Sequence, residues 1–257
     1  MEPSVRAAPK LLRLTDRGRT AAVIFDGDDT LWETESLYDL ARSEAAQIVA
    51  STGYDPDQFE ELQRSIDATK VQTMGLSAAR FPASSVEAFT ELARRAGGTP
   101  TPEALERVAV ASAKVFAKKA PLVPFAEQLL SELVESFRLA LVTKGDEAVQ
   151  KTRVEASGLR HYFDRVEIVS NKNADTFLRL LHRLDAIPTE SWSIGNSLPS
   201  DVGPALEAGM QAIWIDAHVW SHERRQHSVD MSNPHLHVAS HLRDVPMILA
   251  SVGQPAP

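Results

Sequence analysis

Five apolar residues at 21–25, AAVIF, run directly into Asp26, Asp28 and Asp29. A short, continuous apolar run is typical of a strand buried on both faces, as in a parallel sheet. Carboxylates placed after such a strand lie close together, and like charges about 4 Å apart repel by roughly 1–4 kcal/mol. A chain that carries this cluster needs a cation beside it or a chemical use for it.

The second half of the chain alternates apolar strands with helical patterns. The predicted strands are 137–142, 166–169, 191–195 and 212–215, and the predicted helices are about 125–135, 146–157 and 174–184 with a short one around 204–209. Such alternation predicts right-handed crossovers and a parallel sheet with helices on both faces. We therefore expect an α/β fold in three layers, with residues 21–25 pairing with strands much later in the chain.

Residues 36–120 show helical periodicity and no convincing strand. Asp55-Pro56 and Thr101-Pro102 each combine a capping residue with proline at the first helical position. Ser84 with Glu87 matches a capping box and predicts a helix start there. This stretch is expected to form an all-helical module inserted just beyond the carboxylate cluster.

These patterns divide the chain into a leader at 1–20, a core at 21–35 and 121–257, and the helical module at 36–120. The leader lacks an apolar run of signal-peptide length, and no run approaches the ~20 residues of a membrane span. A net charge of −8 without a basic face argues against nucleic acid as a partner. The absence of cysteine excludes a cysteine nucleophile and suits a cytoplasmic location. The oligomeric state stays open.

Four predicted strand ends carry polar residues, and ligands of open parallel sheets bind at such ends. The polar segments are Asp26-Gly27-Asp28-Asp29-Thr30, Thr143-Lys144-Gly145-Asp146, Ser170-Asn171-Lys172, and Gly195-Asn196-Ser197 with Asp201. Oxygen ligands without nitrogen or sulfur favour Mg²⁺. A carboxylate there can attack phosphorus, a second can move the proton, and a hydroxyl and an ammonium can hold the phosphoryl oxygens.

The same residues resemble the four motifs of the haloacid dehalogenase superfamily, in its phosphatase branch with a helical cap inserted after the first strand. The counterparts, in order along residues 21–216, are Asp26, Asp28 and Thr30 of a DxDxT motif, then Thr143, then Lys172, and then the loop from Asn196 to Asp201. The resemblance implies a Rossmann-like core with an all-helical cap domain.

The resemblance also implies a Mg²⁺-dependent phosphomonoesterase that hydrolyses a small phosphorylated metabolite through an aspartyl phosphate. Asp26 would be the nucleophile and Asp28 the general acid and base. Thr143 and Lys172 would bind the substrate phosphate. The implied ligands of Mg²⁺ are Asp26, Asp28 through its backbone carbonyl, Asn196 and Asp201.

Two positions depart from the family pattern. Asp29 stands where the family usually has glycine, and it could point to solvent, contact substrate or add charge beside the metal. Asn196 stands at the first acidic position of the fourth motif, where its amide oxygen is an uncharged ligand. Asp201 is therefore expected to matter more for the metal.

Several other interpretations stay open. The family also contains phosphomutases and 2-haloacid dehalogenases, and a binding protein that kept the fold without catalysis is a third alternative. Lys144 is interpreted as a rim lysine. Six histidines fall within 218–241, but their spacings form no known zinc pattern, so we interpret that segment as a polar surface loop followed by a short strand.

Overall fold

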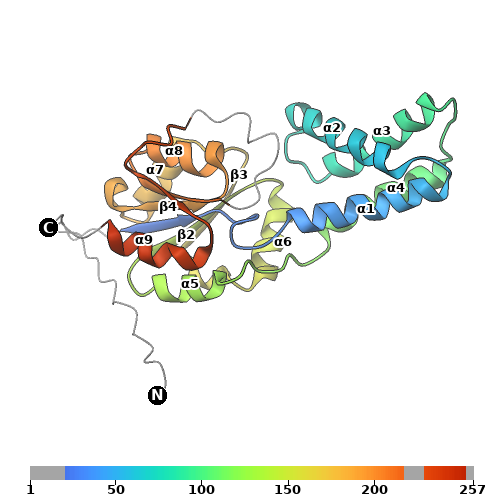
Figure 1. Cartoon of the computed structure of the whole chain (residues 1–257). Coiled ribbons are helices and arrows are strands. Elements are labelled where there is room, and N and C mark those ends of the chain that lie inside the picture. Colours follow the sequence, from blue (N-terminus) through green and yellow to red (C-terminus); the bar gives the residue numbers. More distant parts are fainter. Residues whose placement is uncertain (1–20, 217–228, 253–257) are drawn as a thin grey trace, which may run out of the picture.

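The computed structural model describes residues 21–216 and 229–252. These residues form a parallel sheet covered by helices and a second block of helices that projects from one end (Figure 1). The predicted leader at 1–20 lies outside the described residues, as do His218, His222 and His227. Within the described ranges, no helix combines the length and apolarity needed to cross a membrane.

The described strands form one sheet of the order β3-β2-β1-β4-β5-β6, in which every neighbouring pair is parallel. They are β1 (Ala22–Phe25), β2 (Arg138–Lys144), β3 (Arg165–Val169), β4 (Trp192–Gly195), β5 (Gln211–Ile215) and β6 (Leu236–Ala239). The first strand thus lies inside the sheet between β2 and β4. This confirms the prediction that 21–25 is a buried strand paired with distant ones.

Alternate residues of β1 face opposite sides of the sheet. Val23 and Phe25 join one apolar cluster, while Ala22 and Ile24 join another. Helices α5 (Ala126–Leu133), α6 (Glu147–Ser157) and α9 (Val245–Ser251) contribute to the first cluster, and α7 (Ala174–Arg183) and α8 (Gly203–Glu207) contribute to the second. The predicted three-layer α/β core is therefore confirmed, with α5 and α9 opposite α7 and α8 in Figure 1.

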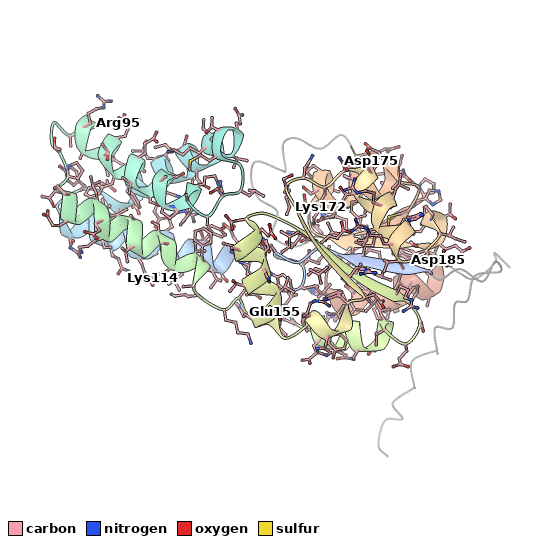
Figure 2. The ribbon with its side chains drawn as sticks, turned by 180° about the vertical axis from the view of Figure 1, so that it is seen from behind. Arg95, Lys114, Glu155, Lys172, Asp175 and Asp185 are labelled. Carbon is pink, nitrogen blue, oxygen red and sulfur yellow. The ribbon has the colours of Figure 1, made fainter. Side chains whose placement is uncertain are left out.

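Four helices between β1 and α5 in the sequence form the second block. They are α1 (Glu35–Ser51), α2 (Pro56–Met74), α3 (Arg80–Arg95) and α4 (Pro102–Ala113). They pack around their own apolar cluster, in which Phe59, Phe89 and Val108 are fully buried. As predicted, Asp55 and Thr101 cap α2 and α4, because each side chain accepts backbone N–H groups of the first turn. Figure 2 shows this block from behind, with Arg95 and Lys114 on it and Lys172 in the sheet-containing part.

The capping box predicted at Ser84 and Glu87 is wrong. Helix α3 begins at Arg80, so Ser84 lies inside the helix. Its buried hydroxyl donates to Oδ1 of Asp67 in α2 at 2.9 Å, and Nη1 of Arg80 donates to Oδ2 of the same Asp67 at 2.6 Å. A serine that hydrogen-bonds across a helix pair is not available to cap its own helix, and the sequence pattern does not distinguish the two uses.

Two chain segments connect the sheet to the helical block, and they run side by side. Glu33 N donates to the carbonyl of Pro121 at 2.8 Å, and Val123 N donates to the carbonyl of Leu31 at 3.0 Å. The segment that leaves β1 is therefore fastened to the segment that returns towards β2.

Candidate active site

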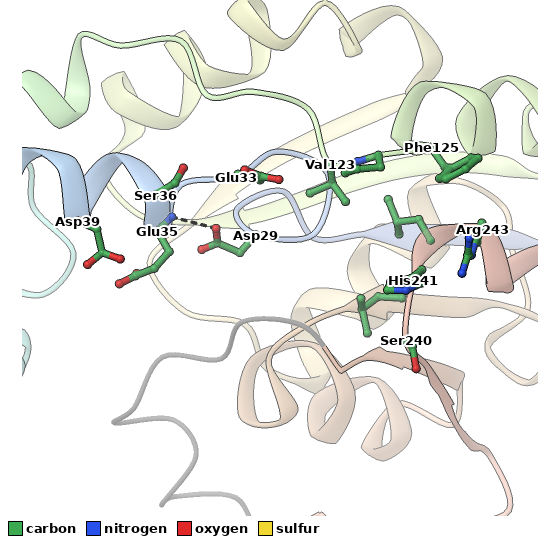
Figure 3. A pocket seen from close by; sticks show the side chains of 13 residues that line it. Asp29, Glu33, Glu35, Ser36, Asp39, Val123, Phe125, Ser240, His241 and Arg243 are labelled. Carbon is green, nitrogen blue, oxygen red and sulfur yellow. Dashed lines mark hydrogen bonds between the residues drawn. The ribbon is translucent and has the colours of Figure 1, made fainter.

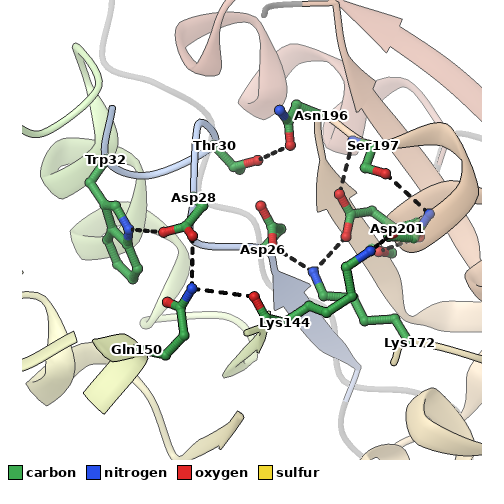
Figure 4. Close-up of polar contacts among 12 residues, drawn as sticks. Asp26, Asp28, Thr30, Trp32, Lys144, Gln150, Lys172, Asn196, Ser197 and Asp201 are labelled. Atoms are coloured by element: carbon green, nitrogen blue, oxygen red, sulfur yellow. Dashed lines mark hydrogen bonds and ion pairs between the residues drawn. The ribbon is translucent and has the colours of Figure 1, made fainter. Parts of the chain in front are cut away.

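The strand order brings the predicted site residues to one edge of the sheet. Asp26 directly follows β1, Thr143 is the second-to-last residue of β2, and Asn196 directly follows β4. Since β1 lies between β2 and β4, these three side chains belong to three adjacent strands. Lys172 follows β3 at the far edge and reaches across to the same place (Figure 4).

Lys172 lies between two carboxylates. Its Nζ atom is 2.5 Å from Oδ1 of Asp26 and 2.6 Å from Oδ1 of Asp201, and all three side chains are buried. Burial alone would lower the pKa of Lys172, but the carboxylates of Asp201 and Asp26 raise it above its ordinary value. Burial raises the pKa of Asp26, against the lowering effect of Lys172, and Asp201 raises it further. Positive charge placed here therefore stabilises the ionised nucleophile candidate.

Asp28 is held by three donors. Nε1 of Trp32 donates to Oδ1 at 2.7 Å, and Nε2 of Gln150 and Nη1 of Arg153 each donate to Oδ2 at 2.7 Å. The sequence analysis did not identify Trp32, Gln150 or Arg153. A detectable signal was present, because Gln150 and Arg153 occupy buried positions of α6 at a spacing of three residues. Polar residues on the buried face of a helix need partners.

Thr143 has a buried hydroxyl without a partner. The residue is 1% exposed, and no hydrogen-bond partner lies near its Oγ1 among the described residues. A buried hydroxyl without a partner is costly in a protein that binds nothing at that point. An anionic ligand oxygen would satisfy it. The neighbouring Lys144 donates to Oγ of Ser200 at 2.8 Å, which fits its interpretation as a rim lysine.

Asn196 and Asp201 lie on the loop after β4. Oδ1 of Asn196 accepts a hydrogen bond of 3.3 Å from Oγ1 of Thr30, and Oδ2 of Asp201 accepts one of 2.9 Å from the backbone N–H of Ser197. Gly195 is needed for this packing, because a Cβ atom there would lie 2.3 Å from Oδ2 of Asp201. The loops that follow β1 and β4 are thus joined by the hydrogen bond between Thr30 and Asn196.

Asp29 serves the fold. Its Oδ1 accepts from the backbone N–H groups of Thr34 and Glu35 at 2.7 and 3.0 Å, and its Oδ2 accepts from the Thr34 hydroxyl at 2.8 Å. It therefore caps the start of α1. Its φ of 61° is left-handed, which explains why a position that usually holds glycine takes one of the few other residues that tolerate this conformation. Its burial contradicts the first role considered from the sequence, in which the carboxylate points to solvent.

The site residues line a cavity between the sheet edge and the helical block. Asp26, Asp28, Thr143, Asn196 and Asp201 contribute from the sheet side, and Tyr38, Leu76, Arg80 and Phe116 contribute from the other. Its volume is about 100 Å³, below the ~300–1,000 Å³ of pockets for drug-sized ligands. Position in the sequence alone makes two segments of the helical block, the turn at 53–55 and the stretch at 70–80, candidates for substrate contact. Leu76 and Arg80 of the second segment line the cavity, and the turn at 53–55 does not.

A larger cavity of about 590 Å³ lies beside the loop that joins β1 to α1 (Figure 3). Its lining includes Asp29, Glu35 and His241 but neither Asp26 nor Lys172. Size does not identify the reactive site here, because Asp26, Asp28 and Thr143, together with Asn196 and Asp201, line the smaller cavity. In the described parts of the chain, no three His, Cys, Asp or Glu side chains gather as a ready-made metal cluster.

Known proteins resemble this chain in sequence and in fold. A match to the haloacid dehalogenase-like hydrolases spans residues 20–209. The chain is 31% identical over 203 residues to a glyceraldehyde 3-phosphate phosphatase of Methanopyrus kandleri, covering 76% of this chain and 83% of the relative. It is 28% identical over 204 residues to a ribulose-1,5-bisphosphate 5-phosphatase of Halopiger xanaduensis, covering 76% and 84%. In fold it is similar to a haloacid dehalogenase-like family hydrolase of Xanthomonas campestris, with a TM-score of 0.74, 24% identity and coverage of 91% and 97%.

Proposed function

The chain belongs to the haloacid dehalogenase-like hydrolases, and from that premise we propose that it is a Mg²⁺-dependent phosphomonoesterase that works through an aspartyl phosphate on Asp26. Phosphoester hydrolysis is the activity for which its curated relatives are named. The observation that carries the proposal is the buried cluster in which Lys172 contacts both Asp26 and Asp201, beside the unpartnered hydroxyl of Thr143.

The residues present fit a magnesium ion. Asp26 and Asp201 offer carboxylate oxygens, Asn196 an amide oxygen and Asp28 its backbone carbonyl, a set of oxygen donors that suits Mg²⁺. The raised pKa of Asp26 gives a physical reason for a cation at this point. When bound, Mg²⁺ supplies positive charge beside the phosphoryl group.

The chain's own residues account for the two chemical steps. A carboxylate oxygen of Asp26 attacks phosphorus, and the bond from phosphorus to the leaving oxygen breaks while Asp28 protonates that oxygen. Asp28 then takes a proton from water, whose oxygen attacks the same phosphorus and releases Asp26. Thr143 donates its hydroxyl to a phosphoryl oxygen, and Lys172 stabilises the charge that develops there.

We assign the helical block at 36–120 to a cap that closes over the site and excludes water. Tyr38, Leu76 and Arg80 line the cavity from this side, so substrate choice depends on them. The small volume of this cavity favours a compact substrate over a bulky one. The dehalogenase alternative is disfavoured because Asp28 supplies an acid and base that haloacid chemistry does not need.

Phosphate release from a panel of phosphomonoesters tests the function. The panel contains glyceraldehyde 3-phosphate, glycerol 3-phosphate, phosphoglycolate, a nucleoside monophosphate and an aryl phosphate, each assayed with Mg²⁺ and with EDTA. Release that needs Mg²⁺ and is absent from the Asp26→Asn protein is expected, with the compact substrates ahead of the nucleotide. Chloride release from a haloacid without Mg²⁺, or a sugar phosphate isomerised without phosphate release, would replace the proposal.

A further inference from the structure

The carboxylate of Asp28 has an uneven set of partners. An ionised carboxylate offers about four lone-pair positions, two on each oxygen. Gln150 and Arg153 occupy both positions of Oδ2, and Trp32 occupies one position of Oδ1. Among the contacts of the described residues, the remaining open position is therefore on Oδ1.

We propose that Trp32, Gln150 and Arg153 are positioning residues that turn Asp28 so that its Oδ1 carries the transferred proton, an inference that rests on the phosphomonoesterase function proposed above. In the first step the proton leaves Oδ1 for the leaving oxygen, which keeps the electron pair of the broken bond to phosphorus. In the second step water gives a proton back to Oδ1 as its oxygen binds phosphorus and the bond to Asp26 breaks.

The rigidity of these partners supports a positioning role. Trp32 is 1% exposed, and a Cβ atom on Gly27 would lie 2.4 Å from its ring, so the indole is wedged against the loop that carries Asp28. Its backbone also pairs with Leu122 of the returning connection. An indole held on both sides presents its N–H in one direction.

Arg153 and Gln150 are fixed in a similar way. Both are buried on α6, and the amide of Gln150 also donates to the carbonyl of Lys144 at 3.3 Å. The guanidinium of Arg153 lies 6.0 Å from the ring centroid of Tyr38 in α1. Through Trp32 and Arg153, the carboxylate of Asp28 is therefore connected both to the linking segments and to the helical block.

Leaving groups that differ in their need for a proton test the inference. Glycerol 3-phosphate expels an alkoxide that needs protonation, whereas acetyl phosphate expels acetate, which is stable as an anion. The ratio kcat/KM covers only the steps up to the first irreversible one, so it isolates transfer of phosphorus to Asp26. The variants are Trp32→Phe and Arg153→Met, with Trp192→Phe as the control for a buried tryptophan and Lys151→Met as the control for a cation on the exposed side of α6.

For both test variants, kcat/KM for glycerol 3-phosphate should fall ~10–100-fold, within the range that proton transfer by a positioned side chain contributes. For acetyl phosphate the loss should stay below ~3-fold, and both controls should stay within ~2-fold of wild type on both substrates, since neither touches Asp28. Equal losses on the two substrates would reduce the contacts to a structural role, and no loss on either would also overturn the inference.

A spectroscopic measurement separates this inference from the function itself. The indole N–H resonance of Trp32 is assigned by its absence from the Trp32→Phe spectrum. It should move upfield in the Asp28→Ala protein, because its carboxylate acceptor is gone. A resonance that stays in place would overturn the contact even in an active enzyme. Failure of wild type to hydrolyse either substrate, with the resonance moving as expected, would count against the phosphatase function and leave the arrangement of Asp28 supported.

Discussion

Lys172, which follows the edge strand β3, places its ammonium 2.5 Å from Oδ1 of Asp26 at the end of the inner strand β1. The same ammonium lies 2.6 Å from Asp201, so one buried cation separates two buried carboxylates. Two such carboxylates without a cation would repel each other strongly in a medium of low dielectric. The arrangement thus offsets part of the cost of ionising the nucleophile candidate and holds its side chain in place.

Replacement of Lys172 by Met removes this cation while keeping most of the side-chain volume. Breaking a buried ion pair on one side costs about 3–5 kcal/mol, so the free energy of unfolding in EDTA should fall by that order. Catalysis should fall by at least ~100-fold, as for the loss of one group that stabilises transition-state charge. Urea unfolding and phosphate release measure the two effects. Unchanged stability in EDTA would show that the ion pair is not formed in solution.

Thr143→Val separates binding from stability. The hydroxyl has no partner in the described structure, so valine of nearly the same shape should leave the free energy of unfolding unchanged or raise it slightly. The rate of phosphomonoester hydrolysis should nevertheless fall by ~10–1,000-fold, because a donor to the phosphoryl oxygens is gone. Thr143→Ser keeps the hydroxyl and should retain most activity. A Thr143→Val protein that is less stable yet fully active would contradict this assignment.

Asp29→Ala tests the cap of α1. The change removes three hydrogen bonds and leaves a residue with a Cβ atom at a φ of 61°. Loss of the cap and the left-handed strain together should lower the free energy of unfolding by about 2–4 kcal/mol. Asp29→Asn keeps an acceptor oxygen and tolerates the conformation, so about half of that loss or less is expected. The measurement is urea unfolding of the three proteins. Equal stability of Asp29→Ala and wild type would rule out the capping role.

The raised pKa of Glu35 predicts that the free energy of unfolding depends on pH. Burial, and after it the nearby Asp39 carboxylate, raises the pKa of Glu35 from 4.5 to about 7. A raised carboxyl pKa means that the folded protein holds the proton more tightly, so stability is fully present below pH 4.5 and is lost as the pH rises towards 7. The loss above pH 7 amounts to at most ~3 kcal/mol.

Glu35→Gln should remove this dependence. Its free energy of unfolding at pH 8 should exceed that of wild type, while the two proteins should be nearly equal at pH 4.5. Thermal or urea unfolding across this pH range gives the comparison. A variant that is less stable than wild type at pH 8 would mean that an interaction of the ionised Glu35 outweighs its burial.

The sequence predicted the parts of the fold that depend on local patterns. The apolar run at 21–25, the alternation after residue 121 and the caps at Asp55 and Thr101 each require only a short window of sequence. The start of α3 was missed because Ser84 uses its hydroxyl on Asp67, a contact between two helices. Such contacts depend on tertiary packing, which overrides local capping patterns.

The candidate site shows the same division. The positions of Asp26, Thr143, Lys172 and Asn196 follow from the rule that strand ends gather at one edge. The spacing of Gln150 and Arg153 signals polar residues that need partners, but it does not assign them to Asp28, because that depends on which face α6 turns towards β1. The role of Asp29 required knowledge of its backbone angle, which no residue pattern supplies.

Chemical trapping of the enzyme during turnover tests the central claim most directly. The protein is mixed with glycerol 3-phosphate and Mg²⁺, quenched in acid, reduced with borohydride and digested for mass spectrometry. Borohydride reduces an acyl phosphate on Asp26 to an alcohol, which converts the residue to homoserine. The peptide that contains residue 26 should therefore be lighter by the mass difference between aspartate and homoserine. The Asp26→Asn protein should yield no peptide with this mass change. Turnover of the substrate with residue 26 unmodified, or with the modification on Asp28 or Asp201, would contradict the assignment of Asp26 as the nucleophile.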